Sequence, residues 1–187
     1  RTVEIGAVPL DIRDPHHHRR VVGHVAEPVF GLAERRLDAA ALGLADVQVV
    51  DPEETDGQGR PYGLLRRGTV RAQSPAAFAQ FVKAALSCPG LRYADGGREI
   101  RTVFVGGGAC AGELARAAEL GCDAFVTADV KYNAFADAVE LGVTLIDAGH
   151  FETENPVCAY LAKNLRAQFP EIEVFVSKTH TDPIKFV

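Results

Sequence analysis

One eight-residue segment carries most of the side chains that could bind a metal ion. Asp147–Glu154 holds one histidine and three carboxylates directly after a predicted strand. His150 and Glu154 stand four residues apart, so a helical turn would bring the imidazole and the carboxylate to one point. That donor pair suits zinc, iron, manganese or nickel. In the competing interpretation His150 bonds a backbone carbonyl and Glu154 serves the first turn of a helix.

Two further loops hold groups that could act with this pair. Asp129 is placed to cap the helix that follows it. Lys131 would lie in the first turn of that helix, where the dipole disfavours a cation, so it either neutralises a carboxylate, awaits an anionic ligand or is solvated. The run Gly106–Gly112 could turn its amides towards a phosphate. It lacks a P-loop ending and a complete GxGxxG pattern, which favours a plain tight turn.

Other reactive side chains give weaker signals. Three adjacent histidines, His16–His18, cannot all reach one metal from a regular element, and their neighbours Pro15 and Arg19 are typical of a solvated loop. Cys110 lies near a helix start, which could lower its pKa, but no histidine motif adjoins it. The four cysteines form no CxxC pair, so we expect buried or half-buried thiols in a reducing, cytoplasmic environment.

The elements that position these loops alternate between strands and helices. Strands are expected at 63–70, 100–105, 124–127, 143–146 and 173–176, and helices at 76–86, 113–120, 130–141 and 156–169. The alternation predicts an α/β fold with a mainly parallel sheet, and the short apolar strands indicate helices on both faces. Ligands of such sheets bind beyond the carboxyl ends of the strands, where the three loops lie.

The first sixty residues show weak periodicity, which predicts an irregular N-terminal segment over 1–60 and an α/β domain over 61–187. A short strand is expected at Thr2–Ile5 and a helix within 30–44. The chain begins with Arg and contains no Met, from which we expect a fragment or a processed product.

The composition bounds the classes of function. The chain has 187 residues, of which 47% are hydrophobic and 24% are charged. These proportions fit a globular protein and exclude a mostly disordered one. The net charge of −5 comes with no basic face of the kind that binds nucleic acid, and no apolar run is long enough to span a membrane.

Three blocks of the sequence resemble successive signatures of one family. They are Val103–Gly108, Phe125–Tyr132 and Leu145–Glu154. Their order and spacing are similar to those of the Nif-three-like family of dinuclear-metal-centre proteins, often called GTP cyclohydrolase 1 type 2 homologues. The resemblance covers roughly 62–176.

The resemblance implies an α/β protein that assembles as a hexameric ring around a two-metal site. It makes His150 a terminal metal ligand and Glu154 a bridging one, with two divalent ions per chain in a complete member. It also implies metal-assisted hydrolysis, with Lys131 and the glycine-rich loop holding a small anionic substrate.

The chain departs from the family pattern in two places. Asp129, Lys131 and Tyr132 are retained in the motif Gly-Asp-x-Lys-Tyr-His, but Ala128 and Asn133 replace its first and last residues. Upstream, the family's His-His-Pro motif and its ligand Asp are not intact: 16–18 and 37–40 only partly resemble them. We therefore expect an N-terminally incomplete or altered member.

Three functions stay open at this point. The first is a metal-dependent hydrolase of this family, and the second is a non-enzymatic assembly or interaction module with an incomplete metal site. The third is a nucleotide-binding α/β domain that uses Gly106–Gly112 without a metal.

Overall fold

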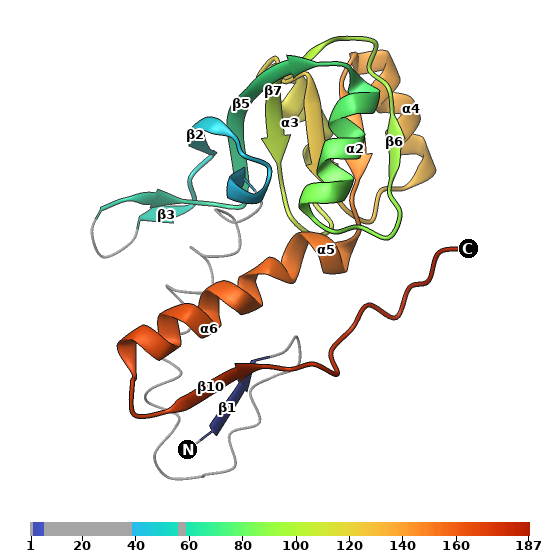
Figure 1. Cartoon of the computed structure of the whole chain (residues 1–187). Coiled ribbons are helices and arrows are strands. Elements are labelled where there is room, and N and C mark those ends of the chain that lie inside the picture. Colours follow the sequence, from blue (N-terminus) through green and yellow to red (C-terminus); the bar gives the residue numbers. More distant parts are fainter. Residues whose placement is uncertain (1, 6–38, 56–58) are drawn as a thin grey trace.

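The computed structural model describes residues 2–5, 39–55 and 59–187 (Figure 1). The strands are β1 (Thr2–Ile5), β2 (Ala45–Val50), β3 (Glu54–Thr55), β4 (Pro61–Tyr62), β5 (Leu65–Gln73), β6 (Arg92–Ala94), β7 (Ile100–Val105), β8 (Ala124–Thr127), β9 (Thr144–Asp147) and β10 (Glu173–Val176). The helices are α2 (Pro75–Ala85), α3 (Leu114–Glu119), α4 (Tyr132–Leu141), α5 (His150–Glu154) and α6 (Pro156–Gln168), with a 3-10 turn η1 (Ala111–Glu113) before α3.

The central sheet has six strands in the order β2-β5-β7-β8-β9-β6. Only β7, β8 and β9 run parallel to one another, whereas β2–β5, β5–β7 and β6–β9 are antiparallel pairs. The α/β class is confirmed, but the prediction of a mainly parallel sheet is wrong: the sheet is mixed. The three parallel strands still place the loops after β7, β8 and β9 at one edge.

Helices cover both faces of the sheet, as predicted. On one face Phe78 and Val82 of α2 pack against alternate strand residues such as Val103 and Val126. On the other face α3 and α4 pack against the intervening residues, among them Phe104. Figure 1 shows α2 in front of the sheet and α3 behind it.

Local signals explain where two of these helices begin and end. The side chain of Ser74 accepts a hydrogen bond from the amide of Ala77, and Pro75 occupies the first turn of α2, so the predicted cap is confirmed. Gly142 ends α4 in the left-handed conformation, at φ 68°. The start of α4 is at Tyr132, two residues later than the predicted Val130.

Part of the N-terminal segment is more regular than the sequence predicts. Residues 45–50 are not irregular: they form β2, an edge strand of the main sheet that pairs with β5. The predicted strand at Thr2–Ile5 is confirmed as β1, which pairs in parallel with β10 beside α6, below the main sheet in Figure 1. The histidines at 16–18 and most of the helix expected within 30–44 lie outside the described residues. The domain boundary near residue 60 stays a prediction.

None of the helices in the described part of the chain has the length and apolar character that a membrane span requires.

Candidate metal site

Three loops meet at the carboxyl end of the parallel strands, and Gly108 joins them. Its carbonyl accepts hydrogen bonds from the amide of Ala128 at 2.9 Å and from the hydroxyl of Thr127 at 3.0 Å. Its own amide donates to the hydroxyl of Thr153 at 3.0 Å. The loops after β7 and β8 are therefore fixed against α5, as the parallel arrangement of β7, β8 and β9 predicts.

His150 and Glu154 face each other across one helical turn. They are the first and last residues of α5, and His150 Nε2 lies 3.1 Å from Glu154 Oε1. The side chains are 44% and 50% exposed, so a small ion can reach them from solvent. The predicted helical turn is confirmed, while the role of the pair as metal ligands stays a prediction.

The second nitrogen of the imidazole contacts the loop after β8. His150 Nδ1 lies 2.7 Å from Asp129 Oδ2. An ionised carboxylate can only accept, so Nδ1 donates. This hydrogen bond is the main reason that the pKa of His150 is raised, and the charge of Glu154 adds to it. The prediction that Asp129 caps α4 is wrong, because Lys131 occupies the cap position and Asp129 instead bonds His150.

These three side chains do not converge on a single point. Asp129 lies on the Nδ1 side of the ring and Glu154 on the Nε2 side. Within the described residues no group of three or more His, Cys, Asp or Glu side chains is arranged to hold a metal ion. The arrangement thus offers one two-donor edge, formed by Nε2 of His150 and Oε1 of Glu154.

The spacing of that edge fits one divalent ion. Metal bonds to histidine nitrogen and carboxylate oxygen are about 2.0–2.2 Å long, so two donors lie about 3 Å apart when bound at right angles and about 3.4 Å apart in the tetrahedral geometry of zinc. The 3.1 Å between Nε2 and Oε1 is close to the right-angled separation, and it is also the length of a hydrogen bond between the two groups. The hydrogen bond from Nδ1 to a carboxylate is also typical of a metal-binding histidine.

The other two carboxylates of the 147–154 segment are used elsewhere. Asp147 is buried and accepts hydrogen bonds from Arg92 at 2.5 Å and from the amides of Val130 and Gly149 at 3.2 and 3.3 Å. Glu152 is also buried, and this burial raises its pKa, as does the nearby Asp182. Of the three carboxylates only Glu154 faces His150.

The glycine-rich loop is a tight turn rather than an open anion cradle. The amides of Gly106, Gly108 and Cys110 all donate within the protein. The Cys110 thiol donates to the carbonyl of Gly107 at 3.2 Å, so it too is directed at its own loop. These contacts do not favour the nucleotide-binding alternative. Lys131 is exposed at the start of α4, two residues from Asp129.

Two features of the site had no clear signal in the sequence. One is the contact between Asp129 and His150, which joins loops 21 residues apart. The other is the cross-linking of the three loops by the hydroxyls of Thr127 and Thr153. Both threonines end or follow predicted strands, but only the order of the strands in the sheet brings them to Gly108.

A comparison with protein families decides the relationship of this chain to known proteins. The family model described as Duf34/NIF3 (NGG1p interacting factor 3) matches residues 31–183, which include all three loops of the site. The chain belongs to the Duf34/NIF3 family. The predicted family resemblance is thereby confirmed.

The curated relatives that this chain matches are longer than the chain itself. A GTP cyclohydrolase 1 type 2 homolog of Nostoc sp. is 35% identical over 136 residues, which are 69% of this chain and 49% of the relative. The homolog of Streptomyces coelicolor is 34% identical over 178 residues, which are 86% of this chain and 60% of the relative. The chain thus spans about half to three fifths of the length of these relatives.

Solved structures show the same fold. A Bacillus cereus protein related to NIF3 superposes with a TM-score of 0.71 at 19% identity, covering 82% of this chain and 69% of its own. A hypothetical protein of Staphylococcus aureus gives a TM-score of 0.70 at 21% identity, covering 82% and 64% of the two chains.

Proposed function

We propose that this Duf34/NIF3 protein binds a divalent metal ion through His150 and Glu154 and serves metal-assisted hydrolysis. The observation that carries the proposal is the two-donor edge at 3.1 Å, with the far nitrogen of the imidazole bonded to Asp129. A divalent ion at this edge would lower the pKa of a water molecule and polarise a substrate.

The other groups of the site support an anionic substrate. Lys131 is exposed at the start of α4, two residues after Asp129, and we expect its positive charge to attract an anion. Two donors leave most positions of a divalent ion open, so further donors have to come from water, from substrate, from residues outside the described ranges or from another copy of the chain. A second ion and the hexameric ring implied by the resemblance belong to this proposal as well.

Metal content is the decisive measurement. The purified protein is loaded in turn with Zn²⁺, Fe²⁺, Mn²⁺ and Ni²⁺, dialysed and analysed by mass spectrometry of the metals. We expect retained metal in the parent and loss of it in His150→Ala and Glu154→Gln. A parent protein that retains none of the four metals would contradict the proposal.

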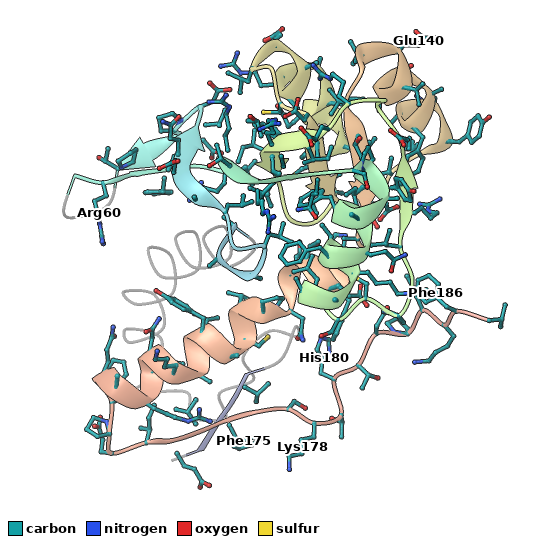
Figure 2. The ribbon with its side chains drawn as sticks, turned by 45° about the horizontal axis from the view of Figure 1, so that its top comes forward. Arg60, Glu140, Phe175, Lys178, His180 and Phe186 are labelled. Carbon is teal, nitrogen blue, oxygen red and sulfur yellow. The ribbon has the colours of Figure 1, made fainter. Side chains whose placement is uncertain are left out.

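The chain offers matched control variants. His180 is the one other histidine in the described ranges. The centroid of its ring lies 5.1 Å from the centroid of the Phe151 ring. Glu140 is an exposed carboxylate on α4, and Figure 2 shows it at the top of the view, apart from His180, which lies lower in the molecule. His180→Ala and Glu140→Gln should retain metal like the parent.

A second candidate, a non-enzymatic assembly module, is favoured by one observation: the described residues supply two donors to the ion rather than three. Turnover distinguishes the two. The relatives are described as GTP cyclohydrolase 1 type 2 homologs, so GTP is the first substrate to test. Product that requires both metal and His150 supports the hydrolase, and metal binding without turnover of GTP supports the module.

A further inference from the structure

The backbone at Asp129 has an unusual conformation next to the site. Its φ is 53°, in the left-handed region that few residues other than glycine adopt, although aspartate and asparagine tolerate it best. Among the described residues Asp46, Asp51 and Ser87 share a positive φ, but only Asp129 contacts His150. Such conformations persist where the surrounding structure enforces them.

The residues on either side of Asp129 are held in place. The amide of Ala128 donates to the carbonyl of Gly108 at 2.9 Å, and the amide of Val130 donates to the buried Asp147 carboxylate at 3.2 Å. Both neighbours are buried, with exposed fractions of 0% and 3%. Asp129 therefore bridges two fixed points, and its side chain is directed out of the loop to His150.

The contact with Asp129 selects one form of the imidazole ring. Neutral histidine carries a single ring proton, and two carboxylates compete for it: Asp129 Oδ2 lies 2.7 Å from Nδ1 and Glu154 Oε1 lies 3.1 Å from Nε2. The shorter contact, to Asp129, favours the proton on Nδ1. In this form the lone pair of Nε2 faces the acceptor oxygen of Glu154, an arrangement that a cation between the two atoms would stabilise. Without the acceptor the ring is able to rotate or to place its proton on Nε2, which would block metal binding at that atom.

We propose that Asp129 is a positioning residue. It does not contact the metal, but it fixes the Nδ1–H form and the orientation of the His150 ring, which binds the metal. The inference rests on the proposed function, since it assumes that His150 Nε2 is a ligand. Loss of such an acceptor typically weakens metal binding 10–100-fold.

Two variants distinguish the effect of losing the Asp129 acceptor oxygen from the effect of straining the backbone at this position. Asp129→Gly removes the acceptor and tolerates a positive φ, so it adds no strain to the loop. Asp129→Asn keeps an acceptor oxygen and also tolerates this conformation. Asp137→Asn changes an exposed carboxylate on α4 and serves as the control. Thermal melting confirms that each variant is folded.

The first readout is the position of the ring proton in the metal-free protein. Long-range ¹H–¹⁵N spectra of the imidazoles are recorded over a pH series, and the variants are compared above the pH at which the observed titration of His150 is complete. We expect the Nδ1–H form in the parent, in Asp129→Asn and in the control, and loss of its dominance in Asp129→Gly. An unchanged spectrum in Asp129→Gly would overturn the inference.

The second readout is the Kd for Zn²⁺, measured by competition with a chromophoric chelator. We expect Kd to rise 10–100-fold in Asp129→Gly, to rise less in Asp129→Asn, and to stay unchanged in the control. Equal losses in the Gly and Asn variants would show that the charge of Asp129, not its acceptor oxygen, matters, and would overturn the inference.

The two proposals fail in different ways. If the parent binds Zn²⁺ and His150→Ala does not, but Asp129→Gly binds like the parent, only the role of Asp129 is overturned. If the parent does not bind Zn²⁺, or if His150→Ala binds it equally well, the proposed function is overturned and the role of Asp129 with it.

Discussion

Gly108 leaves the space that the Glu154 carboxylate occupies. A Cβ atom at position 108 would lie closer than 3.0 Å to Glu154 Oε1, and it would also come within 3.5 Å of the His150 ring. Gly108 has a φ of 64°, which disfavours any other residue there. The same glycine that joins the three loops thus leaves space for the Glu154 carboxylate, one of the two proposed metal donors.

Gly108→Ala should displace Glu154 without unfolding the protein. The clash falls on the end of a flexible, half-exposed side chain, so the variant should lose only the cost of a left-handed alanine, about 1–2 kcal/mol. Gly121→Ala is the matched control, since Gly121 has a φ of 66° and open space around it. Urea denaturation should give similar losses for both variants, whereas a metal-binding assay should detect a defect in Gly108→Ala alone. A metal affinity equal to that of Gly121→Ala would contradict this assignment.

His150 should stabilise the metal-free protein in acid and not in alkali. Its pKa is raised above the usual 6.5, chiefly by the hydrogen bond to Asp129, so the folded state favours the protonated ring. The gain is full below the unfolded pKa and disappears as the pH rises through the folded pKa. Because the ring is 44% exposed, solvent screening limits the gain to below about 1 kcal/mol. The difference in unfolding free energy between the parent and His150→Gln should shrink between pH 5.5 and pH 9; a difference that grows would contradict the assignment.

Bound metal should show the opposite dependence on pH. A proton on Nε2 competes directly with the ion, so acid should release the metal and binding should release protons. Zn²⁺ affinity measured across the same pH range should rise until His150 is neutral and then level off. His180→Ala should follow the parent curve, since that ring contacts Phe151 rather than the two-donor edge.

Asp147 should matter more for stability than its exposed neighbours in the loops. Removing its carboxylate in Asp147→Ala leaves the amides of Val130 and Gly149 and the Arg92 guanidinium without this acceptor. Lost hydrogen bonds to a buried charged group cost about 1.5–3 kcal/mol. Asp147→Asn keeps one acceptor oxygen and should cost less. Urea midpoints of the two variants test the order, and equal midpoints would show that these hydrogen bonds contribute little.

The cysteines should differ sharply in reactivity. Burial raises the pKa of Cys88 to about 11 and also raises that of Cys122, and a protonated thiol is a poor nucleophile. Cys110 is partly exposed, whereas Cys158 is buried. Maleimide at neutral pH should modify Cys110 first in the native protein and the other three only in urea, as peptide mass spectrometry can show. Early modification of Cys88 would indicate that this part of the core opens readily.

Most elements around the site could be predicted from local pattern. The strands that became β7, β8 and β9 are short apolar runs between helices with clear stop signals, such as Gly142 after α4. Strand direction was harder, because it depends on the path of the connections and not on the residues of the strand. The strand β6 was missed altogether: Arg92–Ala94 has three residues and no apolar alternation, and it forms only because β9 offers it an edge.

The sequence predicted the part of the candidate site that depends on contacts within one helical turn, but not the part that depends on contacts between loops. A spacing of four residues was enough to place His150 against Glu154, because helical geometry is fixed. The contact of Asp129 with His150 was not predictable, since a residue before a helix is usually a cap. Its φ of 53° accompanies hydrogen bonds that its neighbours Ala128 and Val130 make to Gly108 and Asp147 in other loops.

The two edge strands of the main sheet, β2 and β6, limit how copies of the chain could associate. At one border β2 has an irregular register between Ala45 and Gln48, and at the other β6 is only three residues long. Short or irregular borders are poor templates for a strand from another molecule, and they also limit aggregation. Any ring of subunits should therefore be built through side-chain surfaces, such as the outer face of α4, where Tyr132 is 88% and Val139 is 53% exposed.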